Sequence, residues 1–487
     1  MILIKVLLTN MWELFGILTL LLTTGTFSVE GKLFLFRHRI PPPEEPEFRT
    51  SPEWGTFTQR VDHFDPADNR TWQMRYVKNT DFYEEGRPMF LYIGGEWNIT
   101  SRWVTSGLMF DMARLHKGIL FYTEHRFYGS SYPIGDLTVD SLKYLSADQA
   151  LADLVYFIEY QKQNTPGLRN STVIVEGSSY AGALATWARI KYPHIVDIAY
   201  SSSGPLYAKA DFTEYYEVVE ENLRLASPSC PKLIKSAMVK VTEMLKTRNG
   251  SANVSKLFRS CKTVNGSSEL DRSYFLSSIP FEFGSVVQSA QPGDVVAACR
   301  ALENQTGSDV EKFAKYVRPS KGCIDYSYNG AVEYLSATKK GATDDERQWM
   351  YQTCTEFGWF QTRGFGGAFT VDLYYQMCKD IFGKDFDSYT LNNGTERTNL
   401  FYGGKKPKVT RLVTCQGTVD PWSKLGLEKN LNEDTVTIIV NGTSHSADLY
   451  SIRDSDSDQL KRAKNKIMDT ISAWIIEKEE KYKKNPQ

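Results

Sequence analysis

The chain has 487 residues, of which 41% are hydrophobic and 13% aromatic. It is therefore long enough for two or three lobes, at roughly 100–200 residues per domain. Its 57 Lys and Arg residues balance 58 Asp and Glu residues, whereas a protein that neutralises phosphates carries a basic excess, so nucleic acid is excluded as an expected partner.

The chain begins with an apolar segment that is typical of a signal peptide. Residues 1–28 carry only Lys5 and Glu13 as charges, and the apolar run 14–22 is followed by small residues. This run is shorter than the ~20 apolar residues that a membrane-spanning helix requires, and no later segment is long and apolar enough. We expect a cleaved signal peptide at 1–28 and no stable membrane insertion; the alternative is an uncleaved anchor.

After residue 50 the chain alternates between short apolar runs and helical patterns. Short apolar runs bounded by turn residues predict buried strands, and apolar residues at helical spacing predict helices. Strands alternating with helices indicate a mainly parallel sheet that is covered on both faces. The predicted strands are 89–93, 118–122, 172–175, 195–200, 411–415 and 435–440, and the predicted helices are 146–163, 180–192 and 457–478.

The middle of the chain has a different character. Helical patterns dominate residues 208–386, strand signals are few, and all seven cysteines lie between Cys230 and Cys415. We interpret 208–386 as a helical, disulfide-containing cap lobe inserted into an α/β domain formed by 50–207 and 387–487. Seven is an odd number, so at least one thiol is free or pairs outside the chain. The sequence contains no C-x-x-C pair, so the cysteines do not indicate a zinc site.

Nine Asn-x-Ser/Thr sequons give further support for a secretory route. Glycosylated asparagines must lie on the surface of a protein that enters the secretory pathway. The candidates are Asn69, Asn98, Asn170, Asn249, Asn253, Asn265, Asn304, Asn393 and Asn441.

The strongest local motif surrounds Ser179. A predicted strand runs into the sequence EGSSYAG and a predicted helix runs out of it, which is the context of a nucleophile elbow. Gly177 stands two residues before Ser179, but Ala181 rather than glycine stands two residues after it. Ser178 lacks a glycine two residues before it. The alternative is an ordinary strand–helix turn.

A serine nucleophile requires a base, and the base requires an acid. In α/β-hydrolases the chain order is serine, acid, histidine, and only His194 and His445 follow Ser179. His194 would face the wrong end of the sheet, whereas His445 lies in the loop after the last predicted strand. Asp420 follows the preceding strand and is the expected acid. Asp448 is an alternative, but it stands only three residues from His445.

The oxyanion of an acyl-transfer reaction needs two backbone N–H donors. One is expected from Tyr180, the residue after the nucleophile, and the other from the Gly94-Gly95-Glu96 loop, where we assign Gly95. The alternative for that loop is a plain glycine turn.

Together these segments resemble the Pro-Xaa serine carboxypeptidase family, which includes prolylcarboxypeptidase, dipeptidyl peptidase II and thymus-specific serine protease. The resemblance extends over about residues 56 to 475 and is greatest to the thymus-specific branch, through Ser179 to Gly182 and Gln352 to Gly358. The other matching segments are 59–65, Gly94 to Glu96, 124–131, 417–422 and 444–449.

The resemblance implies an α/β-hydrolase fold and cleavage of short peptides on the carboxyl side of proline, at acidic pH in lysosomes or endosomes or outside the cell. It maps the same triad onto Ser179, Asp420 and His445. Trp422 would pack on the proline ring, with Glu96 as a second substrate-binding candidate, while Glu124-His125-Arg126 would be structural. The mechanism requires no metal or organic cofactor.

The resemblance also bears on the cysteines. Some relatives carry a further cysteine where this chain has Gln361-Thr362-Arg363, a loss that would leave Cys230 unpaired, and Cys354 is expected to pair with Cys378. Two other functions stay open, an esterase or lipase of the same fold and a secreted glycoprotein that binds peptides without cutting them. The sequence leaves open the exo- or endopeptidase mode and the oligomeric state, including a homodimer.

Overall fold

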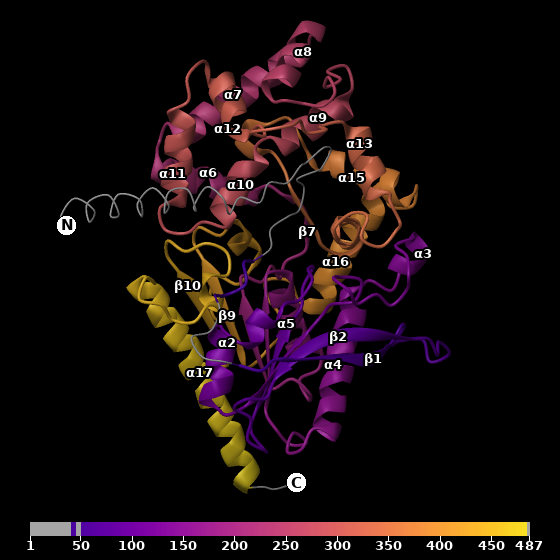
Figure 1. Ribbon diagram of the computed structural model, residues 1–487, viewed down its shortest axis with the longest axis vertical. Helices are drawn as coiled ribbons and strands as arrows, with labels where there is room; N and C mark the ends of the chain where they lie inside the picture. The colour runs from indigo at the N-terminus through magenta and orange to yellow at the C-terminus, as the bar shows by residue number, and fades with distance from the viewer. Residues whose placement is uncertain (1–39, 45–49, 485–487) are drawn as a thin grey trace, which may run out of the picture.

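The computed structural model describes residues 40–44 and 50–484, so the predicted signal peptide lies outside the described residues. Two parts are visible in Figure 1, a lower part built on a sheet and an upper part built from helices.

The lower part is organised by an eight-stranded sheet in the order β1-β2-β4-β3-β5-β6-β9-β10. The strands from β4 to β10 along this order pair in parallel, whereas β1 and β2 are antiparallel. The strands are β1 (Glu53–Arg60), β2 (Thr71–Asn79), β3 (Met89–Ile93), β4 (Ile119–Thr123), β5 (Val173–Ser178), β6 (Ile198–Ser202), β9 (Leu412–Gly417) and β10 (Thr435–Val440).

Helices cover both faces of this sheet, which explains why its central strands are buried throughout. Ile119 and Phe121 of β4 face one buried cluster, and Leu120 and Tyr122 face the other. The first cluster includes residues of α4 and α5, and the second includes residues of α2 and α17. These helices are α2 (Leu108–Leu115), α4 (Ala147–Asn164), α5 (Tyr180–Lys191) and α17 (Asp458–Lys484), with the short α3 (Val139–Leu142) at the periphery.

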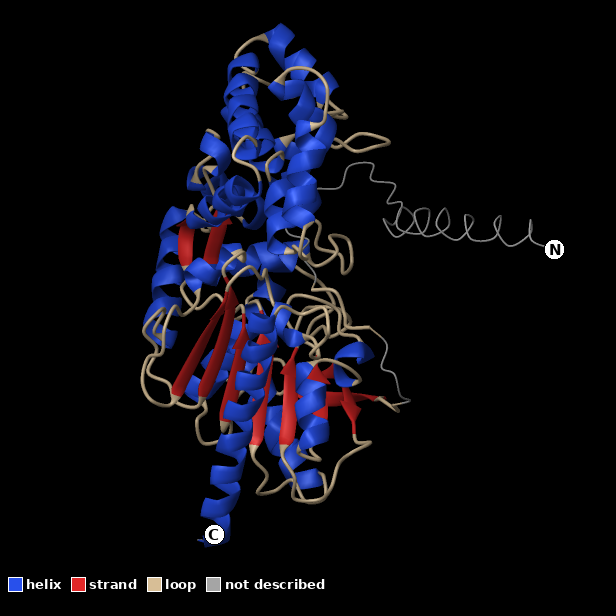
Figure 2. Ribbon diagram, turned by 90° about the vertical axis from the view of Figure 1, so that its left-hand side faces the viewer, coloured by secondary structure: helices blue, strands red, loops and turns tan. Residues whose placement is uncertain are grey.

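The upper part is a helical lobe that enters between β6 and β9 and lies beyond the carboxyl ends of the strands (Figure 2). It also contains a two-stranded parallel sheet of β7 (Lys209–Phe212) and β8 (Gly358–Gln361). Its helices are α6 (Glu214–Ala226), α7 (Cys230–Met244), α8 (Arg248–Leu257), α9 (Glu269–Ser278), α10 (Phe281–Gln288), α11 (Asp294–Glu303), α12 (Asp309–Val317), α13 (Tyr328–Leu335), α14 (Glu346–Gln352) and α15 (Val371–Phe382).

The architecture confirms the predicted α/β-hydrolase class, with differences at its edges. Helix α16 (Ser388–Tyr402) continues the helical segment past residue 386 and contacts both parts, because Arg397 pairs with Asp148 while Thr398 donates to the Glu356 carbonyl. The cap boundaries of 208–386 therefore stay a prediction. The pairs β1–β2 and β7–β8 were missed, since β1 is largely exposed and β7 has only four residues.

Three disulfides stabilise the helical lobe: Cys230–Cys299, Cys261–Cys323 and Cys354–Cys378. The predicted Cys354–Cys378 bridge is present. The expectation that Cys230 is unpaired is wrong, because α7 and α11 pack side by side and bring Cys230 to Cys299. The free thiol belongs to Cys415, which is buried within β9.

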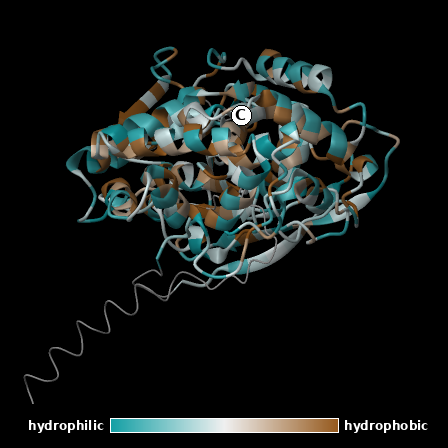
Figure 3. Ribbon diagram, turned by 90° about the horizontal axis from the view of Figure 1, so that it is seen from above, coloured by the Kyte–Doolittle hydropathy of each residue, from teal (hydrophilic) through white to brown (hydrophobic). Residues whose placement is uncertain are grey.

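Figure 3 shows hydrophilic and hydrophobic residues interspersed along the helices when the molecule is seen from above. All nine sequon asparagines are exposed, as glycosylation would require, and their modification stays a prediction. Within the described part of the chain, no helix combines the length and apolar character needed to cross a bilayer.

Candidate active site

Ser179 lies at the sharp turn between β5 and α5. Its backbone has φ 56° and ψ −128°, a strained conformation for a residue with a side chain. A Cβ on Gly177 would lie 1.9 Å from the Ala181 carbonyl oxygen, and one on Gly182 would lie 2.9 Å from the Ser202 oxygen. This close backbone approach has the geometry of a nucleophile elbow and explains the glycines beside Ser179.

Asp420 and His445 meet at the carboxyl ends of β9 and β10. Because these strands are parallel neighbours, the loops that follow them leave the sheet at the same edge. His445 Nδ1 lies 2.8 Å from Asp420 Oδ2, and the Trp422 N–H donates to Asp420 Oδ1 at 2.9 Å. Both side chains are buried. With the Nδ1 proton held by the carboxylate, Nε2 of His445 is the nitrogen that can accept a proton.

The His445 loop is fastened to the elbow through the neighbours of both residues. Ser446 Oγ lies 2.6 Å from Ser178 Oγ, and the Ser446 N–H donates to Ser203 Oγ at 2.9 Å. No hydrogen bond joins the Ser179 hydroxyl to His445 among the described residues. Catalytic hydrogen bonds are often long when no substrate is bound, and a direct Ser179–His445 contact is expected in the substrate complex.

The structure separates the other candidates from this site. Asp448 accepts hydrogen bonds from Tyr200 and Ser202 rather than from His445. His194 is exposed beyond the end of α5, at the opposite edge of the sheet. A broad hollow at that opposite edge is lined in part by Arg189 and Lys406 and contains none of the candidate residues.

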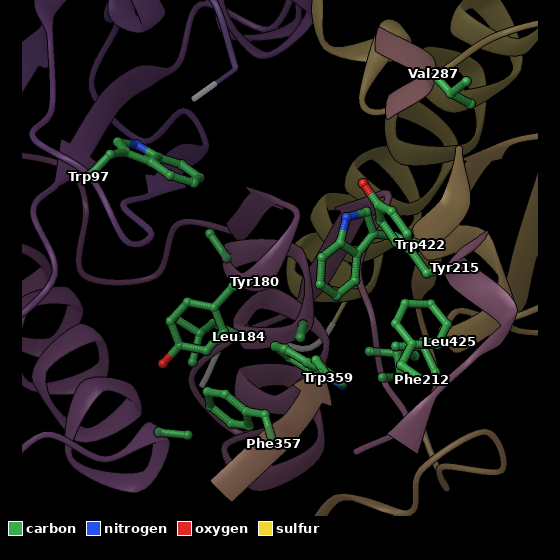
Figure 4. Packing of buried hydrophobic residues seen from close by; sticks show 14 of the residues in the cluster. Trp97, Tyr180, Leu184, Phe212, Tyr215, Val287, Phe357, Trp359, Trp422 and Leu425 are labelled. Atoms are coloured by element: carbon green, nitrogen blue, oxygen red, sulfur yellow. The ribbon is translucent and has the colours of Figure 1, made fainter. Parts of the chain in front are cut away.

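An aromatic pocket opens beside Ser179. Its lining includes Tyr180, Trp359 and Trp422, together with Glu96, so both predicted substrate-binding residues face it. The Trp359 and Trp422 rings lie 5.9 Å apart at 82°, and Figure 4 shows them side by side with Tyr180. Glu96 is the only charged side chain in this lining. Such a pocket suits a flat or compact apolar group next to the serine.

Tyr180 and Gly95 stay the predicted oxyanion donors. The backbone N–H groups of Tyr180 and Gly95 have no hydrogen-bond acceptor within the described part of the chain. A Cβ on Gly95 would lie 2.7 Å from the Trp97 ring, which explains the glycine.

A buried hydrogen-bond network fixes the side chain of Tyr180. His125 Nδ1 donates to the Arg126 carbonyl at 2.7 Å, which leaves Nε2 to accept from the Tyr180 hydroxyl at 3.1 Å. Gln352 of the helical lobe donates to the same hydroxyl at 3.0 Å. Burial lowers the pKa of His125 to about 4, so it is neutral in this network. Sequence reasoning assigned His125 and Gln352 only to matching segments, without this role.

Residues of the matching segments 59–65 and 124–131 make further buried polar contacts, with Asp153 and with Arg75. Arg126 forms an ion pair with Asp153 at 2.7 Å, and His63 contacts the same carboxylate at 2.7 Å. Glu124 accepts from Arg75 and from the Ile99 backbone N–H, which ties the loop after β3 to β4. These residues lie too deep for a chemical step, consistent with a structural role for Glu124-His125-Arg126.

Comparison with known proteins gives consistent results. The family model described as serine carboxypeptidase S28 matches residues 59–467. Thymus-specific serine protease of Mus musculus is 31% identical over 87% of this chain and 88% of its own. Lysosomal Pro-X carboxypeptidase of Pongo abelii is 27% identical over 86% of this chain and 87% of its own. The human thymus-specific serine protease is 29% identical over 87% of both chains.

Proposed function

The chain belongs to the serine carboxypeptidase S28 family and is a serine peptidase, and from this premise we propose that it hydrolyses short peptides on the carboxyl side of proline as an exopeptidase. Ser179 is the nucleophile, His445 the base and Asp420 the acid of this proposal. The acyl-enzyme forms when His445 Nε2 takes the Ser179 proton and the serine oxygen attacks the scissile carbonyl. His445 then gives this proton to the leaving amine.

The observation that carries the proposal is the 2.8 Å hydrogen bond between His445 Nδ1 and Asp420 Oδ2. It connects the two loops that sequence order had selected, next to an elbow serine. The developing oxyanion would bind to the N–H groups of Tyr180 and Gly95. Losing one such donor typically costs about 10²–10³ in turnover.

The aromatic pocket supports the preference for proline. Trp422 presents its ring to the pocket that Ser179 lines, while its indole nitrogen is held by Gln288 at 2.8 Å. An indole face that is fixed in this way would pack against a pyrrolidine ring. The Trp422→Ala variant is expected to lose much of the ratio of kcat/KM for a proline peptide over its alanine analogue; an unchanged ratio would exclude this role.

One relative and the covalent structure support a secretory compartment for this protein. Two of the relatives named above are thymus-specific and one is lysosomal by name, and the three disulfides form in an oxidising compartment. We place the protein in the secretory pathway, with a lysosomal, endosomal or extracellular destination.

The decisive experiment incubates the protein and its Ser179→Ala variant at about pH 5 with peptides that carry proline at the second, penultimate or an internal position. Mass spectrometry of the products locates each cut. Cleavage after proline by the wild type alone is the expected result, and its position gives the exopeptidase mode. Cleavage by both proteins, or activity only on acyl esters, would refute the proposal.

A further inference from the structure

Gln288, the last residue of α10, connects the helical lobe to both loops of the proposed triad. Its side-chain oxygen Oε1 accepts from Trp422 Nε1 at 2.8 Å and from the Tyr215 hydroxyl at 3.0 Å. Its backbone oxygen accepts from the His445 N–H at 3.1 Å and from the Ser444 hydroxyl. Neither the sequence of the predicted cap lobe nor any motif identifies Gln288 as a functional residue.

These contacts determine which way the Gln288 amide points. An indole N–H can only donate, so the atom that faces Trp422 must be the carbonyl oxygen of the amide. The Tyr215 hydroxyl takes the second lone pair of that oxygen, and Figure 4 shows the Trp422 nitrogen and the Tyr215 oxygen close together. The amide nitrogen Nε2 therefore points away from both rings. It donates no hydrogen bond within the described residues.

The Gln288 side chain is 4% exposed and lines the pocket that contains Ser179. The unpaired Nε2 is not among the fully buried side-chain atoms that lack a partner in the described part of the chain, so it is open to the pocket, where a substrate oxygen can supply its acceptor. His445 indicates which part of the pocket faces the leaving group, because it returns its proton to the leaving group during acyl transfer. The Gln288 carbonyl holds the His445 backbone, and this contact is the basis for assigning Gln288 to the leaving-group side of the scissile bond.

We propose that Gln288 is a specificity-determining residue whose Nε2 donates a hydrogen bond to a carbonyl or carboxylate oxygen of the substrate residue after the scissile bond. This inference rests on the proposed peptidase function. Among the described residues no cationic side chain lines the pocket, so the side-chain donors there for such an oxygen are neutral, and of its two glutamines, Gln288 and Gln361, Gln288 is the one whose backbone holds His445. One hydrogen bond of this kind corresponds to about 5-fold to 50-fold in kcat/KM.

The test compares two substrates with the same prolyl acyl group. One is a peptide with a residue after proline, and the other is a p-nitrophenyl ester, whose leaving group has no carbonyl at that place. Gln288→Met keeps the side-chain length and removes the donor. We expect its kcat/KM to fall at least about 5-fold more on the peptide than on the ester. Equal losses on both substrates would reduce Gln288 to a positioning residue and overturn the inference.

Tyr215→Phe is the matched control, because it removes one hydrogen bond to Gln288 Oε1 and leaves Nε2 in place. Its ratio of peptide to ester activity is expected to equal the wild-type ratio. A ratio as low as that of Gln288→Met would show that any disturbance of Gln288 causes the effect, which would also overturn the inference. Fluorophosphonate labelling of Ser179 verifies that each variant is folded.

The pH dependence of the Gln288→Glu variant distinguishes a substrate contact from a merely structural role. The new side chain still accepts from Trp422 and Tyr215, but once ionised it repels a substrate oxygen. The loss on the peptide relative to the ester should therefore grow as pH rises, and a flat ratio would contradict the proposal. If the wild type hydrolyses the ester but never the peptide, the proposed function fails; if it hydrolyses both and the variants leave the ratio unchanged, only this inference fails.

Discussion

Two buried aspartates lie near His445, and the regions that hold them differ in kind. Asp420 lies under the helical lobe, where it contacts the His445 ring and accepts from the Trp422 N–H. Asp448 lies in the cluster between the sheet and α17, where it accepts from Tyr200 and Ser202. Although Asp448 is three residues from His445 in sequence, Asp420 is the partner, because β9 and β10 are parallel neighbours whose loops leave the same edge.

The two regions also differ in the hydrogen-bond partners of their acidic side chains. Glu176, on β5, faces Asp448 from the same side of the sheet, and neither of its carboxyl oxygens has a partner among the described residues. Burial and the nearby Asp448 raise the pKa of Glu176 well above its usual range. Burial also raises the pKa of Asp448. Under the lobe the carboxyl group of Asp420 is paired with His445, whereas burial under α17 raises the pKa of both acids.

The largest expected effect tests whether Asp420 alone serves His445. Asp420→Asn keeps the acceptor for Trp422 but cannot hold the Nδ1 proton of His445 in place, so kcat should fall about 10⁴-fold with a prolyl peptide. The melting temperature should change little, since the volume and one hydrogen bond are retained.

Asp448→Asn is the matched control for this measurement. Asp448 is closer to His445 in sequence than Asp420 is, its substitution makes the same chemical change, and it lies outside the pocket, so we expect less than about a tenfold change in kcat. A comparable loss of kcat in both variants would mean that both aspartates are needed for catalysis, so that the two regions would not differ in function.

The sequence predicted the parts of the molecule that local patterns encode. Buried apolar runs marked the central strands, and the predicted helix 146–163 corresponds to α4, which begins after Ser146, whose hydroxyl accepts from the Gln149 N–H. The order serine, aspartate, histidine selected the residues that the structure brings together at one sheet edge, because loop positions in a parallel sheet follow from strand order.

Contacts between distant segments could not be predicted in this way. Gln288 lies 134 residues from Trp422 and carries no motif, so its place depends on how the lobe packs on the sheet. The Cys230–Cys299 bridge likewise depends on the packing of α7 against α11 rather than on cysteine spacing. Glu176 was read only as part of the elbow motif, since burial of a carboxyl group without a partner leaves no sign in the sequence.

A smaller effect tests whether Glu176 is neutral. A folded-state pKa above the unfolded value of about 4.3 means that the folded protein binds the extra proton, so stability falls as pH rises above that value. Glu176→Gln removes this penalty. We expect its melting temperature to exceed that of the wild type by about 2 °C or more at pH 7.5, with the difference shrinking towards pH 4.

Melting curves over this pH range for the wild type and Glu176→Gln make the comparison directly. Glu356→Gln is a useful control. Burial also raises the pKa of Glu356, to about 7, but unlike Glu176 its carboxylate has a hydrogen-bond partner, the Ala147 N–H. If Glu176→Gln destabilises equally at both pH values, Glu176 is an ionised and stabilised group, and the contrast between the two regions disappears.

The smallest expected effect concerns Cys415, the free thiol of the region under α17. Burial and the nearby Asp448 raise the pKa of this thiol well above its usual range. Since the thiolate is the reactive form, iodoacetamide at pH 8 should leave the native protein almost unlabelled and should alkylate one cysteine per chain after unfolding without reductant. Peptide mapping should place that label at Cys415. Fast labelling of the native protein would show that water reaches this cluster, and burial could then not explain the raised pKa of Glu176 and Asp448. A label at Cys230 would contradict the disulfide pairing of the lobe.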